Sequence, residues 1–499
     1  MRRFLILFCI TACSTQEEPG NRISFTEVDA EIDSAHSEKS DSESILEVNG
    51  SGMGLFDFDK DGDFDLFVAN ANAPCRLYEN ISQDTIKFRE VTEKIKCQQL
   101  VGATGVAIGD ANGDDYDDIY ITSHGQNRLL LNMQGDWFED VTKRANVGDE
   151  RWGTSARFGD LDGDGDNDLY VCNYLDFDQS NLPAKASYKG EDVFGGPHGL
   201  PPQYDVVYEN IGDGIFKDVT EVWGFQNKPS FALNASIIDF NNDGHLDVFV
   251  GNDSMANYLF LNDGNQPPYF VNTGVASGVA ANGDGSMQAT MGIGISDVSG
   301  NGRADVFTTN FSSDTNTLHL NQVTGFFDDR TKRYGLGLPS RTYLGWTCGF
   351  HDFDLDGDDD LYIVNGHVYP NATMSTMDSA HKQAPLLFER EGERFAQIKQ
   401  LGEYEDRAAV FGDLDNDGDI DIIVAQRSGV IRILRNNADP PSVQRHIVEA
   451  PLGARIVIKF TDGTSVTKWF TDGSGFQSSS EPLPIILPAN AELDALTVY

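Results

Sequence analysis

Short apolar runs bounded by Gly, Asn and Asp recur along most of the chain, and they follow one order. A Gly-rich run such as 105–109 comes first, and a β-branched and aromatic run such as 119–121 comes second. A third run, for example 128–132, ends in Asn, and a fourth, for example 138–142, reads Phe-Glu-Asp-Val-Thr. Runs this short, rich in strand formers and separated by turn residues, predict four β-strands per unit. Apolar residues at helical spacing are nearly absent, so few helices are expected.

Between the first and second runs lies an acidic signature of nine residues, which occurs seven times. Its copies, here loops one to seven, begin at Asp57, Asp110, Asp160, Asp239, Asp297, Asp352 and Asp413, which are 53, 50, 79, 58, 55 and 61 residues apart. Four short strands in each of seven tandem units predict an all-β fold, a seven-bladed β-propeller. A β-helix of acidic repeats is the alternative, but its repeats would be far shorter.

The signature places oxygen atoms at regular positions in a tight loop. Alternate residues point inward, so positions 1, 3, 5 and 9 present side-chain oxygens and position 7 presents its backbone carbonyl. A hard divalent cation takes several oxygen ligands at ~2.3–2.6 Å. Gly at position 6, present in six of the seven copies, permits the sharp turn. Solvated acidic turns are the alternative, but they would not require Gly at a fixed position, so the sequence predicts metal sites.

The predicted ligands occupy positions 1, 3, 5, 7 and 9 of every loop. In loops one to four they are Asp57, Asp59, Asp61, Asp63, Asp65, Asp110, Asn112, Asp114, Tyr116, Asp118, Asp160, Asp162, Asp164, Asp166, Asp168, Asp239, Asn241, Asp243, His245 and Asp247. In loops five to seven they are Asp297, Ser299, Asn301, Arg303, Asp305, Asp352, Asp354, Asp356, Asp358, Asp360, Asp413, Asp415, Asp417, Asp419 and Asp421. At position 7 the side chain of His245 is expected to point away from the site.

The seven loops differ in charge. Loops one, three, six and seven carry Asp at positions 1, 3, 5 and 9 and are expected to bind best. Loop two has Asp115 where Gly is expected, and loop five, whose anions are Asp297 and Asp305, is expected to be the weakest. Oxygen ligands in flexible loops favour Ca²⁺ over Mg²⁺, which demands a stricter octahedron. His is absent from most loops, which argues against Zn²⁺, so the prediction is Ca²⁺ at up to seven sites.

Acidic residues outnumber basic ones, 79 to 36, and the formal net charge is −43. Such an excess repels nucleic acid, whose phosphates need Lys and Arg. It also occurs in disordered chains, but 39% hydrophobic and 10% aromatic residues indicate a packed core. The nine-residue windows hold 31 of the acidic residues, so much of the charge is concentrated at the predicted cation sites.

The start of the chain has the pattern of an export signal at 1–13. Arg2 and Arg3 precede an apolar stretch, 4–10, that is shorter than the ~20 residues needed to span a bilayer. The stretch runs into Thr-Ala-Cys13, which resembles the lipobox of bacterial lipoproteins and makes Cys13 the expected lipidated N-terminus. An ordinary secretory signal with an incidental Cys is the alternative. Ser14 favours the outer membrane or the cell surface, reached by the lipid anchor alone.

The sequence contains no His-Glu-x-x-His helix, Gly-x-Ser-x-Gly elbow, phosphate loop or Cys-x-x-Cys pair, so catalysis is not expected. Asn365-Gly-His367 is either a ligand contact or a turn whose His bonds a neighbouring loop, and the turn is favoured. Cys75 and Cys97 fall in one repeat and form a candidate disulfide in an oxidising compartment. The segment 173–203, rich in aromatic residues, Pro and Gly, either shapes a binding surface or plugs the channel.

The repeat resembles the FG-GAP/VCBS repeat, also present in integrin α-subunit propellers, and finer features resemble the ASPIC/UnbV, cartilage acidic protein-like family. Those features are Asn365-Gly-His367, Met291-Gly-Ile-Gly294, 310–318, Phe25-Thr-Glu-Val28 with His36, and the tail 453–478. The resemblance covers 23–499 and implies integrin-α-like calcium loops and a small C-terminal β domain. The family prefers a Gly-Leu-Gly turn where this chain has 485–488, and it usually continues past Tyr499 into a Trp-Pro segment. Whether the tail domain is complete therefore stays open.

The predicted organisation is a lipoprotein signal peptide at 1–13, a tether at 14–22, the propeller at 23–440 and the ASPIC/UnbV-like β domain at 446–499. The predicted function is a monomeric, calcium-binding module, lipid-anchored at the cell envelope, that binds a protein or glycan ligand and no nucleic acid. Two alternatives stay open. One is a polymer-acting hydrolase that uses 173–203 and the central channel, and the other is a structural surface component.

Overall fold

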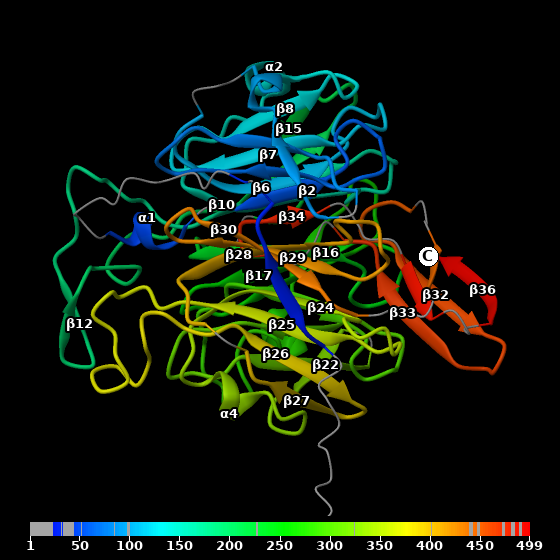
Figure 1. The fold of residues 1–499 in the computed structure, drawn as a ribbon. Coiled ribbons are helices and arrows are strands. Elements are labelled where there is room, and N and C mark those ends of the chain that lie inside the picture. The colour runs from blue at the N-terminus through cyan, green and yellow to red at the C-terminus, as the bar shows by residue number, and fades with distance from the viewer. Residues whose placement is uncertain are drawn as a thin grey trace, which may run out of the picture.

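The computed structural model describes residues 23–30, 32, 44–50, 52–83, 85–96, 100–225, 228–323, 325–400, 402–438, 443–446, 450–471, 475–480, 485–488 and 492–499. These residues form an almost all-β structure (Figure 1). Its helices are single turns, namely α1 (Ile45–Val48), η1 (Thr92–Lys94), α2 (Thr142–Ala145), α3 (Gly274–Ser277) and α4 (Gly337–Ser340). In the described part of the chain, no helix has the length and apolarity needed to cross a membrane.

Each of the first six repeats folds into four antiparallel strands of one sheet, and the seventh repeat supplies three strands of such a sheet. The first four sheets are β2 (Met53–Phe56), β3 (Asp65–Val68), β4 (Arg76–Asn80) and β5 (Phe88–Glu90); β6 (Ala103–Gly109), β7 (Asp118–Ser123), β8 (Arg128–Asn132) and β9 (Phe138–Asp140); β10 (Gly153–Gly159), β11 (Asp168–Asn173), β14 (Val206–Asn210) and β15 (Phe216–Asp218); and β16 (Ala232–Ile238), β17 (Asp247–Asn252), β18 (Tyr258–Asn262) and β19 (Phe270–Asn272). The other three are β20 (Ile293–Ser296), β21 (Asp305–Thr308), β22 (Thr317–Val323) and β23 (Phe326–Asp329); β24 (Gly345–His351), β25 (Asp360–Asn365), β26 (Leu386–Glu391) and β27 (Arg394–Ile398); and β28 (Asp406–Gly412), β29 (Asp421–Gln426) and β30 (Ile431–Asn436) with β1 (Phe25–Val28).

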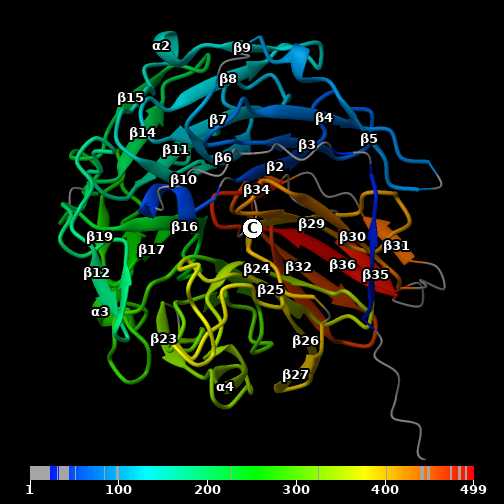
Figure 2. The ribbon, with the colours of Figure 1, turned by 60° about the vertical axis from the view of Figure 1, so that its left-hand side comes forward.

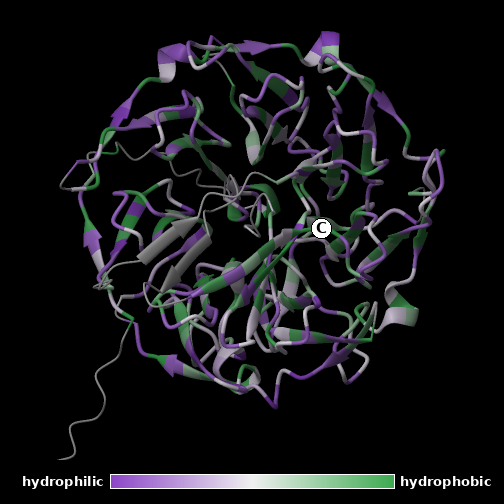
Figure 3. Cartoon of the chain, turned by 90° about the vertical axis from the view of Figure 1, so that its right-hand side faces the viewer, coloured by the Kyte–Doolittle hydropathy of each residue, from purple (hydrophilic) through white to green (hydrophobic). Residues whose placement is uncertain are grey.

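The seven sheets of the described residues stand side by side around a common centre (Figure 3). The first strand of each sheet contacts the first strand of the next, in the order β2, β6, β10, β16, β20, β24 and β28. Strand β28 in turn contacts β2, so the series of sheets returns to its beginning. This arrangement is a β-propeller, and the predicted fold class is confirmed.

The last sheet takes its fourth strand from the start of the chain. Strand β1 pairs antiparallel with β30, with Phe25 opposite Asn436 and Val28 opposite Ile433. The Phe25 ring also lies 5.5 Å, centroid to centroid, from Phe353 of the sixth unit. Both ends of the repeat region therefore contribute to one sheet.

The hydrophobic core lies between neighbouring sheets. One buried cluster joins Phe67 and Leu77 of the first sheet to Ile108 and Ile121 of the second. The inner strands are rich in Gly because the sheets approach closely there. A Cβ on Gly159 would lie 2.9 Å from the Cγ2 atom of Ile237 on the next sheet, so a larger residue would push the two sheets apart.

The C-terminal part of the chain forms a small sheet against one side of the ring (Figure 1). Its strands are β33 (Ser465–Trp469), β32 (Arg455–Phe460) and β36 (Leu493–Val498), and a separate pair joins β31 (Val443–His446) to β35 (Ile485–Pro488). Lys468 of β33 forms an ion pair with Asp359, which lies in loop six. Trp469 packs on a cluster that includes Ile293 and Val306 of the fifth sheet. The tail therefore docks on the ring through specific side chains.

Residues 475–480 run through the middle of the ring. Strand β34 (Ser479–Ser480) pairs parallel with β2 and becomes the fifth strand of the first sheet. Phe476 and Gln477 have no exposed surface, and a Cβ on Gly52 would lie 1.6 Å from the carbonyl oxygen of Gln477. This close approach explains why only a residue without a side chain fits at position 52.

Side chains and backbone groups from several sheets hold this central segment. Thr347 Oγ1 accepts a hydrogen bond from Phe476 N at 3.1 Å, and Ser155 Oγ accepts one from Gln477 N at 3.1 Å. The buried guanidinium of Arg157 donates to Ser478 O at 3.1 Å and to Gly475 O at 2.8 Å. Residues 475–480 of the tail therefore occupy the centre of the ring and contact several sheets there.

The insertion 173–203 lies on the side of the ring opposite the tail sheet (Figures 1 and 2). It contains a hairpin of β12 (Ala186–Tyr188) and β13 (Glu191–Val193). Tyr188 packs on Phe311 and Tyr369, with ring centroids 5.7 Å and 5.6 Å away. The insertion of the third unit thus reaches across to the fifth and sixth units.

Candidate metal centres

Every nine-residue loop connects the first strand of its sheet to the second, so the seven loops lie on the same side of the ring. In all seven, the backbone N–H of position 6 donates to the Oδ2 atom of the Asp at position 1, over 2.7–3.1 Å. The φ angle at position 6 is positive throughout, for example 98° at Gly62. Asp115 adopts the same conformation with a φ of 69°, so loop two keeps the turn without Gly.

The carboxylate at position 9 is buried in all seven loops. In loop three, Asp168 Oδ2 accepts the N–H of Leu161 at 2.9 Å and Oδ1 accepts the N–H of Asn210 at 2.8 Å. The second of these bonds recurs in all seven loops, because the backbone N–H of a residue at or near the end of the third strand of the sheet donates to Oδ1. Position 9 therefore joins the loop to the third strand of its own sheet.

The same residue of the third strand also ties its sheet to the preceding loop. Asn132 Nδ2, in the second sheet, donates to Phe58 O of loop one at 2.8 Å. In the sixth sheet Arg390 replaces Asn, and its Nη2 donates to Val298 O of loop five at 2.8 Å. The other ties are Asn80 to Leu414, Asn210 to Ala111, Asn262 to Leu161, Asn321 to Phe240 and Asn436 to Phe353. The sequence shows the recurring Asn, but sequence reasoning did not assign this role.

Four loops bring three carboxylates together. One oxygen from each of three Asp residues lies within 4.8 Å of the others, and the groups are Asp57, Asp59 and Asp61; Asp160, Asp162 and Asp168; Asp352, Asp354 and Asp356; and Asp413, Asp415 and Asp421. These are loops one, three, six and seven, the four with Asp at positions 1, 3, 5 and 9. An oxygen-only set this close can ligate a hard divalent cation.

Each of these four loops also buries a carboxylate oxygen to which no hydrogen-bond donor of the described residues is directed. These atoms are Oδ1 of Asp59, Asp166, Asp358 and Asp415. A buried acceptor without a donor costs free energy, and a bound cation would remove that cost. Polar atoms of this kind therefore fit a metal ion better than a solvated turn.

In loops two and four, neutral amide side chains supply hydrogen-bond donors to the carboxylates. Asn112 Nδ2 donates to Asp114 Oδ2 at 3.2 Å, and Asn241 Nδ2 donates to Asp243 Oδ2 at 2.8 Å. The amide therefore gives the position-5 carboxylate a partner without an ion. In loop five the Ser299 N–H donates to Asp305 Oδ2 at 2.8 Å.

Lys94 Nζ lies 3.8 Å from Asp59 Oδ2 of loop one, and two further basic side chains stand beside loops six and seven. Arg435 donates to Asp415 Oδ2 at 2.8 Å and to Asp417 Oδ2 at 2.7 Å, so it neutralises part of loop seven from one side. Lys468 of the tail does the same at Asp359 in loop six. Neither cation was anticipated, because Arg435 lies on a later strand and Lys468 lies in another part of the fold.

Burial raises the pKa of the position-9 carboxyl groups. The pKa is about 9 for Asp65, Asp168 and Asp360 and about 8 for Asp421. Neighbouring carboxylates add to the effect, and the backbone N–H donors oppose it. These groups therefore need a nearby positive charge to be fully ionised at neutral pH.

The position-7 side chains divide into two kinds. His245 lies against Gly264, and the Tyr116 ring lies 4.5 Å below the ammonium nitrogen of Lys60. Arg303 donates to the Gln322 carbonyl at 3.5 Å. In contrast, the pKa of Asp166 is raised to about 7 by burial and by Asp164, and that of Asp419 to about 9 by burial and by Asp417. These Asp side chains therefore face the other carboxylates of their loops.

Other candidate residues lie away from the loops. His367 is buried, its Nδ1 accepts the N–H of Tyr369 at 3.1 Å, and its Nε2 lies 3.0 Å from Ser312 Oγ. This is the arrangement of a turn that bonds a neighbouring loop. The Cys75 thiol donates to Leu100 O at 3.6 Å. Cys97 and the lipobox with Cys13 lie outside the described residues, so the disulfide and the anchor stay predictions.

Comparison with known proteins adds the repeat type. A model of the FG-GAP-like repeat family matches residues 57–121, 110–171 and 191–250, which contain loops one to four. Cartilage acidic protein 1 of Xenopus tropicalis is 22% identical over 410 residues, covering 76% of this chain and 58% of that protein. The Mus musculus protein is 22% identical over 414 residues with the same coverage. The chain thus spans just over half the length of these relatives.

Among solved structures, a lectin of Agrocybe aegerita is similar to this chain with a TM-score of 0.43 and 15% identity. The similarity covers 75% of this chain and 88% of the lectin. That lectin specifically recognises non-reducing terminal N-acetylglucosamine.

Proposed function

This chain is a β-propeller that contains FG-GAP-like repeats, and from that premise we propose that it is a calcium-loaded binding module of the cell envelope. In this proposal calcium fixes the loop side of the ring, and the insertion side meets a protein or glycan ligand. A lipid on Cys13 holds the molecule to the membrane. The module works by binding rather than by catalysis.

One observation carries the calcium part of the proposal. Loops one, three, six and seven each bury a carboxylate oxygen that no donor in the described structure reaches, beside two or more further carboxylates. Calcium takes six to eight oxygen ligands at ~2.3–2.6 Å in flexible geometry, whereas magnesium requires a smaller and stricter octahedron. Backbone carbonyls and water supply the ligands beyond the carboxylates. Neutral amides in loops two and four, and the lack of acid in loop five, make those sites weaker.

Calcium binding is tested on the full chain by equilibrium dialysis with elemental analysis. The expected result is at least four tightly held calcium ions per chain, one for each cluster of three carboxylates. An ion that binds only the folded state at a hundred times its Kd adds about 2.7 kcal/mol to the unfolding free energy. Chelation is therefore expected to lower Tm, and an unchanged Tm together with fewer than four bound ions would contradict the proposal.

The binding part rests on the division of the molecule into two sides. The loops and the tail sheet take up one side, and the insertion forms the other, supported by a rigid ring. Binding residues concentrate on loops that a rigid scaffold positions. Pull-down from intact outer membranes with the full chain, in calcium and after chelation, tests this part. Partners recovered only in calcium support it, provided circular dichroism shows that the chelated protein is still folded.

The anchor part rests on the sequence alone. Cys13 follows an apolar stretch that is too short to span a bilayer. Labelled palmitate supplied to the producing cells is expected to enter the wild-type chain and a Cys9→Ser variant, and not a Cys13→Ser variant. Equal labelling of the two variants would reject the lipobox.

A further inference from the structure

A pocket of about 490 Å³ opens on the insertion side, away from the seven loops. Residues outside the four-stranded repeat build it. They come from the start of α1, from the insertion and from the long connection after β25, and they include Ile45, Phe177, Lys185, Asp192, Tyr369 and Asn371. The volume lies within the range of sites for single small ligands.

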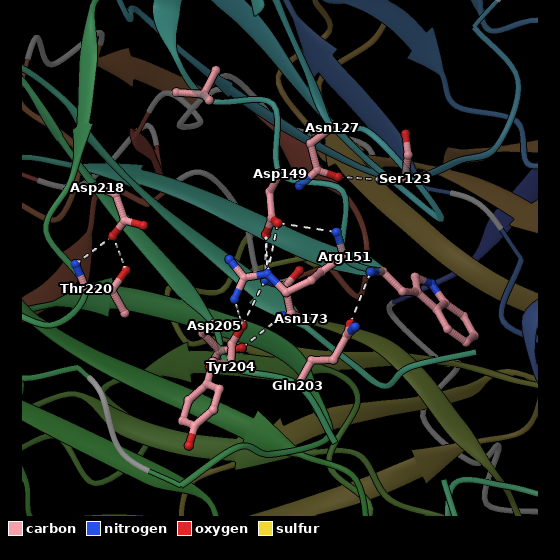
Figure 4. Close-up of polar contacts among 12 residues, drawn as sticks. Ser123, Asn127, Asp149, Arg151, Asn173, Gln203, Tyr204, Asp205, Asp218 and Thr220 are labelled. Carbon is pink, nitrogen blue, oxygen red and sulfur yellow. Dashed lines mark hydrogen bonds and ion pairs between the residues drawn. The ribbon is translucent and has the colours of Figure 1, made fainter. Parts of the chain in front are cut away.

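The base of the insertion is held firmly (Figure 4). Asn173 Nδ2 donates to Asp149 Oδ2 at 2.8 Å and to Tyr204 O at 3.0 Å, and the Asn173 N–H donates to Asp205 Oδ1 at 2.8 Å. Arg151 Nη1 donates to the same Tyr204 carbonyl at 2.9 Å. Both ends of the insertion are therefore fixed to the third sheet.

The far end of the insertion is also held. The Phe194 ring lies 5.0 Å, centroid to centroid, from Tyr369. Lys189 Nζ donates to Met377 O at 2.7 Å and to Ser313 Oγ at 2.5 Å. Because the base and the far end of the insertion are both held, the walls of the pocket are formed before a ligand arrives. This reduces the entropy cost of binding.

The lining has two parts of different chemistry. The floor is apolar and aromatic, and its residues Ile45, Phe177, Val193 and Tyr369 are buried. The rim carries exposed polar groups, namely the carboxylate of Asp192, the ammonium of Lys185 and the amide of Asn371. The two charges at the rim are opposite in sign, so the pocket itself is close to neutral.

We propose that this pocket binds one neutral sugar unit of a glycan. The inference rests on the proposed function and names its ligand class and its site. A sugar ring presents an apolar C–H face, which packs on aromatic side chains, and a ring of hydroxyl groups that donate to and accept from carboxylates, amides and ammonium groups. The aromatic floor and the mixed polar rim match these two faces.

Other ligands fit this lining less well. An apolar peptide side chain would use the floor but would leave the rim groups desolvated without hydrogen bonds. An anionic sugar or a nucleic acid would be repelled by the net charge of −43. A neutral polar ring avoids both costs.

The test uses the full chain in calcium buffer and ligand-observed saturation-transfer NMR. The probes are the methyl glycosides of glucose, galactose, mannose and N-acetylglucosamine, with glucuronic acid as an anionic comparison. At least one neutral probe is expected to bind with a Kd of roughly 0.1–10 mM. Asp192→Asn and Asn371→Ala are each expected to weaken that binding roughly fivefold or more, since the first replaces a charge-assisted hydrogen bond to the sugar with a weaker neutral one and the second removes a hydrogen-bonding group from the rim.

The matched control is Asp178→Asn, an acid-to-amide change in the same insertion but outside the pocket lining. Asp178 Oδ1 accepts the N–H of Ser180 at 2.8 Å, and an Asn oxygen can do the same, so this variant is expected to bind like the wild type. Each variant must keep the wild-type Tm. Binding that is unchanged in the two pocket variants, or tighter binding of glucuronic acid, would overturn the inference. Absence of neutral-probe binding while calcium loading and calcium-dependent partner capture persist would overturn it too, and would leave the proposed function standing.

Discussion

At the scale of single residues, the carboxylates of one loop have different tasks. In loop three, Asp162 at position 3 accepts one backbone hydrogen bond, from Asp164, whereas Asp168 at position 9 accepts two, from Leu161 within the loop and from Asn210 at the end of β14. Asp162→Asn is therefore expected to weaken calcium binding at this loop without lowering the stability of the chelated protein. Asp168→Asn places an amide NH₂ against a backbone N–H and is expected to cost about 2 kcal/mol with or without calcium.

Urea unfolding of both variants, in calcium and in chelator, separates the two tasks. Asp162→Asn serves as the control for the loss of one negative charge, because loops two and four already carry Asn at position 3. Equal destabilisation of the chelated protein by both substitutions would contradict the assigned roles.

The residue types at the loop positions were predictable because their spacing is local. The positive φ at position 6 and the clustering of three carboxylates in loops one, three, six and seven follow from the order of Asp and Gly within nine residues. Arg435 beside Asp415 and Lys468 beside Asp359 were not predictable. Those pairs depend on how distant segments meet, and the periodic pattern carries no information about that.

At the scale of the elements, the Asn residues at or near the ends of the third strands connect neighbouring sheets. Asn132→Ala removes the hydrogen bond to Phe58 O and leaves that carbonyl without its side-chain partner, at an expected cost of about 2 kcal/mol. Arg390→Ala is expected to destabilise the sixth sheet in the same way, since it removes the bond to Val298 O. Arg390→Asn introduces the residue that the other sheets use at this position. It is expected to recover part of the unfolding free energy that Arg390→Ala loses. Unfolding free energies measured in calcium check the series.

The control for this series is Asn265→Ala, an exposed turn residue whose amide bonds Asp263 within the same turn. It is expected to change the unfolding free energy little, because water replaces the lost partner. If Asn265→Ala lowered the unfolding free energy as much as Asn132→Ala does, the hydrogen bond between neighbouring sheets would contribute no more to stability than an exposed turn bond.

Strand number and order within each repeat were predictable, whereas the closing elements were not. Short alternating runs fix four strands per unit, but β1 joins β30 across the length of the chain, and β34 enters the first sheet from the tail. The Ser-rich, Gly-rich segment around Phe476 has the composition of an exposed loop. Its burial depends on the space left by Gly52 and on donors from several sheets.

At the scale of the whole molecule, the tail and the ring are expected to unfold as one unit. Phe476 is fully buried in the channel, with its ring 5.0 Å from Trp346 of the sixth sheet. Phe476→Ala is expected to lower the unfolding free energy of the complete chain by about 3–5 kcal/mol, as large-to-small changes in cores do. Tyr499→Ala, at a residue that is 63% exposed, is the control and is expected to have little effect. A ring transition unaffected by Phe476→Ala would show that the tail is a separate folding unit.

The dependence of stability on pH also belongs to the whole molecule, because loops around the entire ring contribute to it. The folded pKa of the position-9 groups lies near 8 or 9, as in Asp421 and Asp65, far above the ordinary value of 3.8. A group with a raised folded pKa stabilises the fold at low pH, and that stabilisation is lost as the pH rises through the folded pKa. The chelated protein is therefore expected to lose stability between pH 7 and pH 9.

The prediction is restricted to pH 7–9 because, below this range, buried histidines change the unfolding free energy in the opposite direction. Burial lowers the pKa of His367 to about 3 and that of His351 to about 4, so their contribution to stability grows as the pH rises to about 6.5 and is constant above that value. Calcium binds the ionised carboxylates, so the Tm difference between calcium and chelator is expected to widen from pH 7 to pH 9. Measurement of both Tm values at constant ionic strength checks this. A difference that stays constant or narrows would mean that the position-9 carboxyl groups are already ionised without metal, and that the loops do not need a cation to carry their charge.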